Sequence, residues 1–246
     1  MHNYKPAPDL LKDRVILVTG ASDGIGAAAA KSFAAHGATL ILLGRSRRKL
    51  EKVYDEIEQA GGPLPIMHLM NLEGSAPKDY AALAEAVEKE FGRLDGLLHS
   101  ASMLGVLTPM DQYDLEMWAK VMQVNLHAPY LLTRALLPAL RKSSDASVLF
   151  TSANVGRKGR AYWGAYGITN AAIENMMEIW ADELETNTTV RVNSIDPGAV
   201  RTTLRAKAYP AEDPNNLPRA EEILSVYLYL MGPDSRGTTG QRHNAQ

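Results

Sequence analysis

The sequence predicts a single doubly wound α/β domain, in which helices cover both faces of a parallel sheet. Apolar strand-like runs alternate with longer helix-like segments along all 246 residues, and this alternation is typical of parallel strands joined by crossover helices. The runs are RVILVTG, ATLILLG, LPIMHLM, LDGLLHS, SVLFTS and VRVNSID. With 46% apolar residues, the chain can bury a substantial core. We therefore expect one domain over residues 1–246, built from six βα units and a tail.

Two amphipathic stretches are the clearest helix candidates between these runs. They are residues 50–62, LEKVYDEIEQAGG, and residues 81–92, AALAEAVEKEFG, and both end in glycine, which is typical of a helix stop. Residues 201–219, RTTLRAKAYPAEDPNNLPR, break the alternation. Long irregular loops in compact domains are often lids or binding loops, so we expect a substrate lid here, with an ordinary surface loop as the alternative.

Composition narrows the classes of partner. The formal net charge is −2, which offers no global field for nucleic acid or an anionic membrane. The chain has no cysteine, which excludes disulfides, thiolate zinc sites and cysteine nucleophiles and fits a reducing compartment. The polar start MHNYKPAPDLLKD lacks the apolar segment of a secretory signal. We expect a soluble cytoplasmic protein that acts on small molecules.

Metal and hydrolase chemistry have little support in the sequence. His99 and His127 are not spaced as metal ligands, and a packed or capped histidine is the better interpretation of each. Ser152 is not framed by the G-x-S-x-G of a nucleophile turn. We therefore expect no metal site and no serine hydrolase.

A glycine-rich turn follows the first strand-like run. Residues 18–26 read VTGASDGIG and lead into a helix-like segment. Gly20 permits a tight turn, Gly24 lets the backbone approach a pyrophosphate, and Gly26 lets helix and strand pack closely, with the helix N-terminus facing the anion. In this position the pattern predicts a Rossmann-like dinucleotide site, with a merely tight turn as the alternative.

These residues resemble the short-chain dehydrogenases/reductases, whose turn reads T-G-x-x-x-G-x-G. The resemblance covers nearly the whole chain and continues in LDGLLHSAS, MQVNLHAPY, YGITN and DPGAVRT. The runs AYPAEDP and LMGPDSRGTTG are similar to a bacterial branch of the family whose substrates are unassigned. The resemblance implies an oxidoreductase that transfers hydride between a nicotinamide cofactor and a carbonyl or alcohol substrate.

The end of the second strand-like run favours NADP(H) over NAD(H). An acidic residue there binds ribose hydroxyls, whereas a nearby arginine accommodates the 2′-phosphate, and here Gly44 stands in the acidic position with Arg45 beside it. The alternative is that Arg45, Arg47, Arg48 and Lys49 form only a solvated helix start. By resemblance, the expected cofactor contacts are Gly20, Ser22, Asp23, Gly24, Ile25, Gly26, Arg45, Asn71, Ser100, Ala101, Tyr166, Asn170, Pro197, Gly198, Val200 and Thr202.

The catalytic positions of the family are only half matched. The family uses a tyrosine as acid/base, a lysine that lowers the tyrosine pKa and holds the nicotinamide ribose, a serine that orients the substrate oxygen, and an asparagine that supports a relay water. Tyr166 and Asn125 fill the tyrosine and asparagine positions. The lysine position is Asn170 and the serine position is Ala153. A cation about 4 Å from a phenol stabilises the phenolate by roughly 1 to 4 kcal/mol, which lowers the pKa of the phenol by about one to three. Asparagine has no charge to provide this stabilisation. Because alcohol oxidation needs the phenolate as a base, whereas carbonyl reduction needs the neutral phenol as a proton donor, we expect oxidation to suffer more.

Two groups near these positions are candidates to replace the missing serine and the missing lysine. Ser152 is adjacent to Ala153, but successive strand residues face opposite sides, so it reaches the substrate only if a bulge shifts the register. Arg157, Lys158 and Arg160 precede Tyr166 and are candidates for a substitute cation, although long basic side chains on loops usually face water.

The family's N-A-G strand end reads Ser100, Ala101 and Ser102 here. This places side chains where the cofactor usually lies against bare backbone, which we expect to weaken binding.

Two functions remain: a slow NADP-dependent oxidoreductase biased toward reduction, and a nucleotide-binding protein that has lost hydride transfer and acts by binding or assembly. The resemblance also implies a homodimer or homotetramer, formed through helices that correspond to residues 114–142 and 165–187.

Overall fold

The computed structural model describes residues 4–246 and places their strands in one parallel sheet. The order across the sheet is β3-β2-β1-β4-β5-β6-β7. Strands are added on one side of β1 up to β3 and on the other side from β4 onward, and doubly wound folds bind their ligands at this switch point between β1 and β4. The strands are β1 (Val15–Thr19), β2 (Thr39–Gly44), β3 (Ile66–Leu69), β4 (Gly96–His99), β5 (Ser147–Thr151), β6 (Arg191–Asp196) and β7 (Arg242–Asn244). This is the doubly wound α/β architecture that the sequence predicts.

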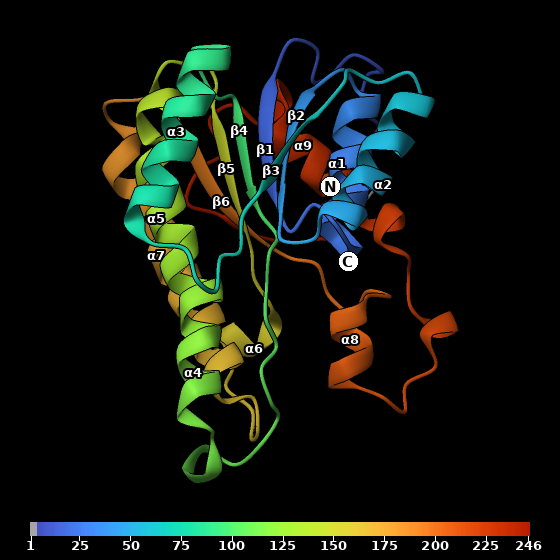
Figure 1. Cartoon of the computed structure of the whole chain (residues 1–246), viewed down its shortest axis with the longest axis vertical. Coiled ribbons are helices and arrows are strands. Elements are labelled where there is room, and N and C mark those ends of the chain that lie inside the picture. Colours follow the sequence, from blue (N-terminus) through green and yellow to red (C-terminus); the bar gives the residue numbers. More distant parts are fainter. Residues whose placement is uncertain (1–3) are drawn as a thin grey trace.

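Helices cover both faces of the sheet, as Figure 1 shows. One layer contains α1, α2 and α9, and the other contains α3, α5 and α7. In the described part of the chain the helices are α1 (Gly24–Ala35), α2 (Arg47–Gln59), α3 (Pro77–Phe91), α4 (Leu115–Met122), α5 (Ala128–Arg141), α6 (Asn154–Arg157), α7 (Gly164–Glu185), α8 (Thr203–Ala208) and α9 (Ser225–Met231).

The sheet is buried between two apolar clusters. Phe33 on α1 and Tyr227 on α9 are fully buried on one side, and Tyr80 on α3 and Met177 on α7 are buried on the other. Strands covered on both faces are apolar at successive positions rather than at alternate ones, which explains why β1 is buried at every residue. This rigid support fixes the loops that leave the carboxyl ends of the strands.

The two helix candidates end close to where their glycines indicate. The helix α2 ends at Gln59 and is followed by Gly61 at φ +76°, and α3 ends at Phe91 with Gly92 as its left-handed cap at φ +71°. Glycine adopts this conformation without the steric penalty of a side chain. Local turn chemistry therefore sets the ends of both helices.

The chain differs from the prediction in two places. The tail after the sixth unit, for which no strand is predicted, contains β7 (Arg242–Asn244), which pairs with β6 at the edge of the sheet. In addition, the helix around Asn125 is interrupted by the π-helical turn η2 (Gln123–His127) between α4 and α5. Single π turns inside helices are frequent at functional sites.

Residues 201–219 lie below the carboxyl ends of the strands in Figure 1. Within them, Leu204 and Ala208 of α8 pack in the same apolar cluster as Val155 of α6. They contain α8 and the short 3-10 turn η3 (Pro214–Asn216). The hydroxyl of Thr202 caps α8 by accepting a hydrogen bond from the Arg205 amide at 3.1 Å. An ion pair between Arg205 and Glu212, with 2.6 Å between Nε and Oε2, ties α8 to the following loop. The segment is thus folded, although it is outside the sheet and helix layers.

Within residues 4–246, no helix is both long and apolar enough to cross a membrane. Residues 1–3 of the polar start fall outside the described part of the chain.

Candidate active site

The glycine turn between β1 and α1 is shaped by close backbone contacts. Gly20 has φ +66°, and a β-carbon on it would lie 2.8 Å from the amide nitrogen of Ala101. A β-carbon on Gly26 would overlap the carbonyl group of Gly20. Gly24 also has a positive φ of +53°. These contacts explain why the turn needs glycine, and they leave bare backbone at the start of a 12-residue helix.

This turn fits the phosphates of a dinucleotide. A helix N-terminus with exposed backbone amides attracts anions, and the turn lies at the switch point of the sheet, next to the carboxyl end of β4. The hydroxyl of Thr19 accepts hydrogen bonds from the amides of Ser100 at 3.0 Å and Ala101 at 3.1 Å. These bonds join the first and fourth strands at the point where the predicted cofactor contacts meet.

The end of β2 carries no acidic side chain. Gly44 is buried, and a β-carbon on it would meet Leu50 at 3.2 Å and the Ser22 hydroxyl at 3.4 Å. Arg45 follows it, exposed, with no hydrogen bond or ion pair to any described residue. An unpaired guanidinium next to a position that has no carboxylate is better suited to bind a 2′-phosphate than ribose hydroxyls.

The other predicted cofactor contacts lie around the same edge of the sheet. Asn71 is exposed after β3, and its Oδ1 accepts a hydrogen bond from the Glu73 amide at 3.3 Å. Thr202 lies over the glycine turn, because a β-carbon on Gly24 would be 3.4 Å from its Cγ2. Ile25 is half-buried at the start of α1. The loop after β6 supplies Pro197, Gly198 at φ +72° and the buried Val200.

Tyr166 and Asn170 share one face of α7, as their spacing predicts. Tyr166 is 8% exposed and Asn170 is 6% exposed. The side-chain amide of Asn170 donates a hydrogen bond to the backbone carbonyl of Tyr166 at 2.8 Å, so it is partly committed to its own helix. Asn170 also has a close neighbour in α6, since a β-carbon on Gly156 would lie 2.8 Å from its Cβ.

The phenol of Tyr166 has a raised pKa. Burial is the main cause, and hydrogen bonding by Asn170 and Ser102 opposes it only in part. The carboxylate of Asp196 raises the pKa further. Tyr166 is therefore set to hold its proton at neutral pH.

Asn125 lies in the π turn and braces the loop that follows β4. Its Nδ2 donates to the Met103 carbonyl at 2.8 Å, and its Oδ1 accepts from the Met103 amide at 2.8 Å. Nδ2 is also 3.3 Å from the Thr169 hydroxyl. The Asn125 side chain therefore holds the loop after β4 against α7, where it contacts Thr169, the residue before Asn170.

The serine position contributes no hydroxyl to Tyr166. Ala153 is an N-cap residue of α6 and packs against the cluster that contains Tyr166. Ser152 is buried, and its hydroxyl donates a hydrogen bond to Glu174 Oε1. Ser194 donates to the other oxygen of Glu174 at 2.6 Å. Ser152 thus belongs to a buried hydrogen-bonded group with Ser194 and Glu174.

The basic residues before Tyr166 have other contacts or face solvent. Arg157 donates to Asn244 Oδ1 at 2.7 Å, and its Nε is 3.6 Å from Glu174 Oε1. Lys158 and Arg160 are exposed. The Arg157 contacts draw its guanidinium toward β7, so the structure gives no support to a substitute cation from this residue.

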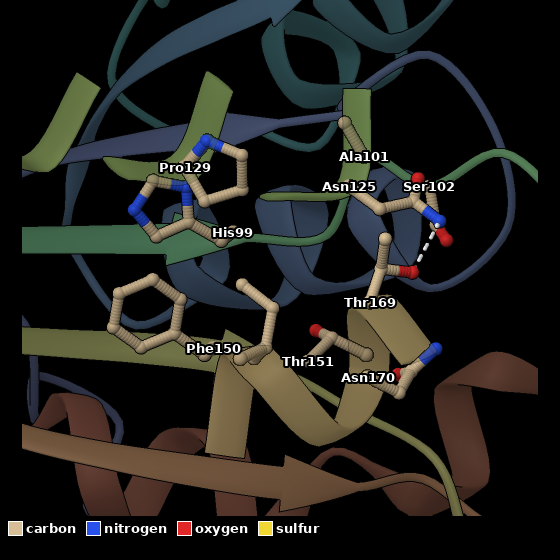
Figure 2. Close-up of a pocket in the computed structure, with 10 residues that line it drawn as sticks. His99, Ala101, Ser102, Asn125, Pro129, Phe150, Thr151, Thr169 and Asn170 are labelled. Atoms are coloured by element: carbon tan, nitrogen blue, oxygen red, sulfur yellow. Dashed lines mark hydrogen bonds between the residues drawn. The ribbon is translucent and has the colours of Figure 1, made fainter. Parts of the chain in front are cut away.

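A small cavity lies between Asn125 and Asn170. Its volume is about 20 Å³, which is close to the space that one water molecule needs. Figure 2 shows its lining, with the amide of Asn170 and the hydroxyls of Ser102 and Thr169 around it. The cavity also reaches His99, whose ring stacks on Phe150 at 4.7 Å and whose burial lowers its pKa to about 3. The cavity wall therefore carries no permanent positive charge from these residues.

Two residues near the phenol were missed in the sequence-based prediction of the site. Ser102 was treated only as an obstacle to the cofactor, but its hydroxyl acts to lower the pKa of Tyr166. Asp196 was not considered, although it immediately precedes the Pro197-Gly198 pair that the motif contains. It is 8% exposed, its Oδ1 accepts from the Gly198 amide at 2.9 Å, and burial raises its pKa. The sequence signal for Asp196 was an acidic residue immediately before the Pro197-Gly198 pair.

The surroundings of Tyr166 are apolar on the side of α8. Leu104 and Val155 are buried with it, and Leu204 and Ala208 of α8 pack against this cluster. The ring of Trp163 lies 5.7 Å from the Tyr166 ring and 5.8 Å from that of Tyr209. The segment 201–219 therefore contributes an apolar wall to the site.

No group of three or more His, Asp or Glu side chains among the described residues is arranged to hold a metal ion. His127 lies in the π turn, where its Nδ1 is 3.3 Å from Gln123 Oε1.

Comparison with known proteins places this chain in a family. Residues 14–213 match the family model described as short chain dehydrogenase, and the chain belongs to this family of oxidoreductases. It is 48% identical to the uncharacterized oxidoreductase YciK of Escherichia coli (strain K12), over 100% of this chain and 96% of that protein.

Two solved structures are similar over their whole length. One is a Pseudomonas syringae protein assigned to the short chain dehydrogenases, with 57% identity, a TM-score of 0.98 and 99% of each chain covered. The other is a protein from Escherichia coli CFT073 in complex with NADPH, with 48% identity and a TM-score of 0.95, covering 98% of this chain and 100% of that one.

Proposed function

We propose that the protein is an NADPH-dependent reductase of carbonyl compounds that is slow and works in the direction of reduction. The observation that carries this proposal is the environment of Tyr166. Burial and Asp196 raise the pKa of its phenol, and no lysine stands at position 170 to lower it. A neutral phenol can donate a proton to a carbonyl oxygen but is a poor base toward an alcohol.

The chain's own residues suggest the following roles. Bound NADPH would supply hydride to the carbonyl carbon. Tyr166 would donate its hydroxyl proton to the carbonyl oxygen, and Ser102 and Asn170 would stabilise the resulting phenolate by neutral hydrogen bonds. Asn125 would hold the β4 loop in place, and a water in the adjacent cavity would return a proton to Tyr166. Without a hydroxyl at Ala153, the developing oxyanion lacks one donor, which typically costs about 10²- to 10³-fold in rate.

The glycine turn, Arg45 and the region around Asn71 would bind the cofactor, and the NADPH complex of the E. coli relative supports this. The preference for NADPH over NADH rests on Gly44 and Arg45. Residues 201–219 would act as a lid whose apolar residues select the substrate. Since Leu104, Val155 and Leu204 surround the phenol, we propose an apolar ketone or aldehyde as the substrate class.

The test combines binding and turnover. Quenching of tryptophan fluorescence by NADPH and NADH measures cofactor affinity, and Trp163, close to Tyr166, is one of the reporters. NADPH consumption with apolar carbonyls is then compared with NADP reduction by the corresponding alcohols, with Tyr166→Phe as the control. We expect tighter binding of NADPH and a measurable reduction that Tyr166→Phe abolishes. Equal affinity for both cofactors would contradict the role of Arg45, and binding without turnover would favour the nucleotide-binding protein that has lost hydride transfer.

The homodimer or homotetramer and the cytoplasmic location stay predictions. Light scattering of the purified protein tests the first of them. Exposed apolar side chains on α4, α5 and α7, namely Leu115, Tyr130, Ile168 and Ile179, support association through these helices.

A further inference from the structure

An ion pair bridges the glycine turn and α2 at the mouth of the proposed cofactor site. Lys49 Nζ is 2.7 Å from Asp23 Oδ2, and each side chain is 49% exposed. Asp23 Oδ1 accepts a hydrogen bond from the Gly24 amide at 2.8 Å and so caps α1. The Thr203 hydroxyl of α8 is 3.4 Å from Asp23 Oδ2. One carboxylate thus contacts three elements that border the site.

The position of this carboxylate is unfavourable for a phosphate ligand. Asp23 lies inside the glycine turn, immediately before Gly24, where the backbone is shaped to approach an anion. The hydrogen bond from Lys49 holds the pKa of Asp23 below its ordinary value, so the group is charged at neutral pH. A negative side chain here repels a cofactor that carries several negative charges, and most strongly the one with an additional phosphate.

Lys49 removes this repulsion without adding a net charge. Near it, Arg47 is 3.7 Å from Glu51, whereas Arg45 has no partner among the described residues. Of the charges on this rim, the Asp23–Lys49 pair sums to zero, and Arg45 and the exposed Arg48 are left uncompensated among the described residues.

We propose that Lys49 is a specificity-determining residue that acts by neutralising Asp23, so that Arg45 can read the 2′-phosphate of NADPH. This rests on the proposed binding of NADPH. Lys49 acts through Asp23 rather than as a phosphate ligand, and Asp23 lowers the affinity for NADPH whenever it is unpaired. The preference for NADPH over NADH is therefore set jointly by Arg45 and by the balance of this pair.

A double-mutant cycle tests the assignment. Lys49→Met keeps the length of the side chain without its charge, and Asp23→Asn keeps a good helix cap. We expect Lys49→Met to lower NADPH affinity about three- to tenfold with a smaller effect on NADH, and Asp23→Asn to raise NADPH affinity by a similar factor. The variant with both changes should return to within about twofold of the original ratio of affinities.

The readout is the dissociation constant of each cofactor, measured by fluorescence titration at low and at high salt, with thermal unfolding to verify that each variant is folded. The matched control is Lys31→Met. It breaks another ion pair between α1 and α2, Lys31 with Glu56 at 2.9 Å, two helical turns away from Asp23. We expect it to leave the ratio of affinities unchanged, and high salt to reduce the effects of the other variants.

The outcomes separate this proposal from the one on which it rests. If the unmodified protein binds neither cofactor, NADPH binding fails and this proposal fails with it. If the protein binds NADPH but Lys49→Met leaves the ratio unchanged, the role of Lys49 is overturned while NADPH binding stands. If the double variant binds NADPH as weakly as Lys49→Met, Lys49 contacts the phosphate directly, and neutralisation of Asp23 is refuted.

Discussion

Restoring the two altered catalytic positions should raise the rate of carbonyl reduction strongly. The change is Ala153→Ser together with Asn170→Lys. Position 170 is one helical turn from Tyr166 and 6% exposed, so a cation there is poorly screened. At about 4 Å it would favour the phenolate by roughly 1 to 4 kcal/mol, which lowers the pKa of Tyr166 by about one to three.

Two other terms modify this estimate. Burying an ammonium group is itself costly, but the buried Asp196 carboxylate close to the phenol offsets part of that cost. The hydroxyl at position 153 adds about 10²- to 10³-fold through the oxyanion. Contributions within one site are not additive, so we expect a gain of at least about two orders of magnitude in turnover of an apolar ketone.

The assay is NADPH consumption under single-turnover conditions over a range of pH. Asn170→Met is the matched control, because methionine approaches the length of lysine without the charge. It should leave the rate low when combined with Ala153→Ser. The doubly restored variant should also gain alcohol oxidation, with an apparent pKa below that of the unmodified protein. No gain over the methionine control would refute the missing-cation explanation and would point to the lid or to Ser102 as the limiting feature.

Three further predictions concern Asp196, the glycine turn and the buried Asp145. Asp196→Asn should lower the pKa of Tyr166 and move the pH profile of reduction to lower pH, as steady-state rates would reveal; an unmoved profile would argue against coupling. Gly26→Ala should abolish NADPH quenching and destabilise the protein by about 1 to 3 kcal/mol in urea unfolding, whereas normal binding would contradict the tight turn. Burial opposes ionisation of Asp145, but Arg191 and a second arginine outweigh it and hold the pKa of Asp145 below its ordinary value. Because the folded pKa is depressed, this stabilisation is complete above the unfolded pKa of about 4 and is lost as pH falls through the folded pKa, so melting temperature should fall below about pH 4; an acid-insensitive melt would contradict it.

Features that depend on short stretches of sequence could be predicted. The alternation of apolar runs gave the parallel sheet, because each strand is buried on both faces. Gly26 was recognisable because its close contact, the carbonyl of Gly20, lies within the same βα turn, and Gly20 because the tight turn needs a positive φ. Strand alternation predicts that Ser152 points away from the substrate, and in the structure its hydroxyl donates a hydrogen bond to the buried Glu174.

Features that depend on tertiary contacts could not be predicted from the sequence. Asp196 and Ser102 are distant from Tyr166 in sequence, and only the fold brings their charge and hydroxyl to the phenol. The pairing of Arg242–Asn244 with β6 required knowledge of the open edge of the sheet. The pair Asp23–Lys49 joins the glycine turn and α2, which sequence spacing does not relate. In each case the interaction partner is set by the arrangement of the elements rather than by a local pattern.

The ionisation of the Tyr166 hydroxyl is the most direct measure of how this site works. Tyrosine labelled with ¹³C at the ring carbon that bears the hydroxyl reports protonation through its NMR shift, and the signal missing from Tyr166→Phe assigns the resonance. With burial and Asp196 acting on a phenol that has only neutral hydrogen-bond partners, we expect no titration of this signal up to about pH 10. A midpoint between pH 7 and 8 would reveal a positive neighbour at the ring oxygen and would contradict the proposed bias toward reduction.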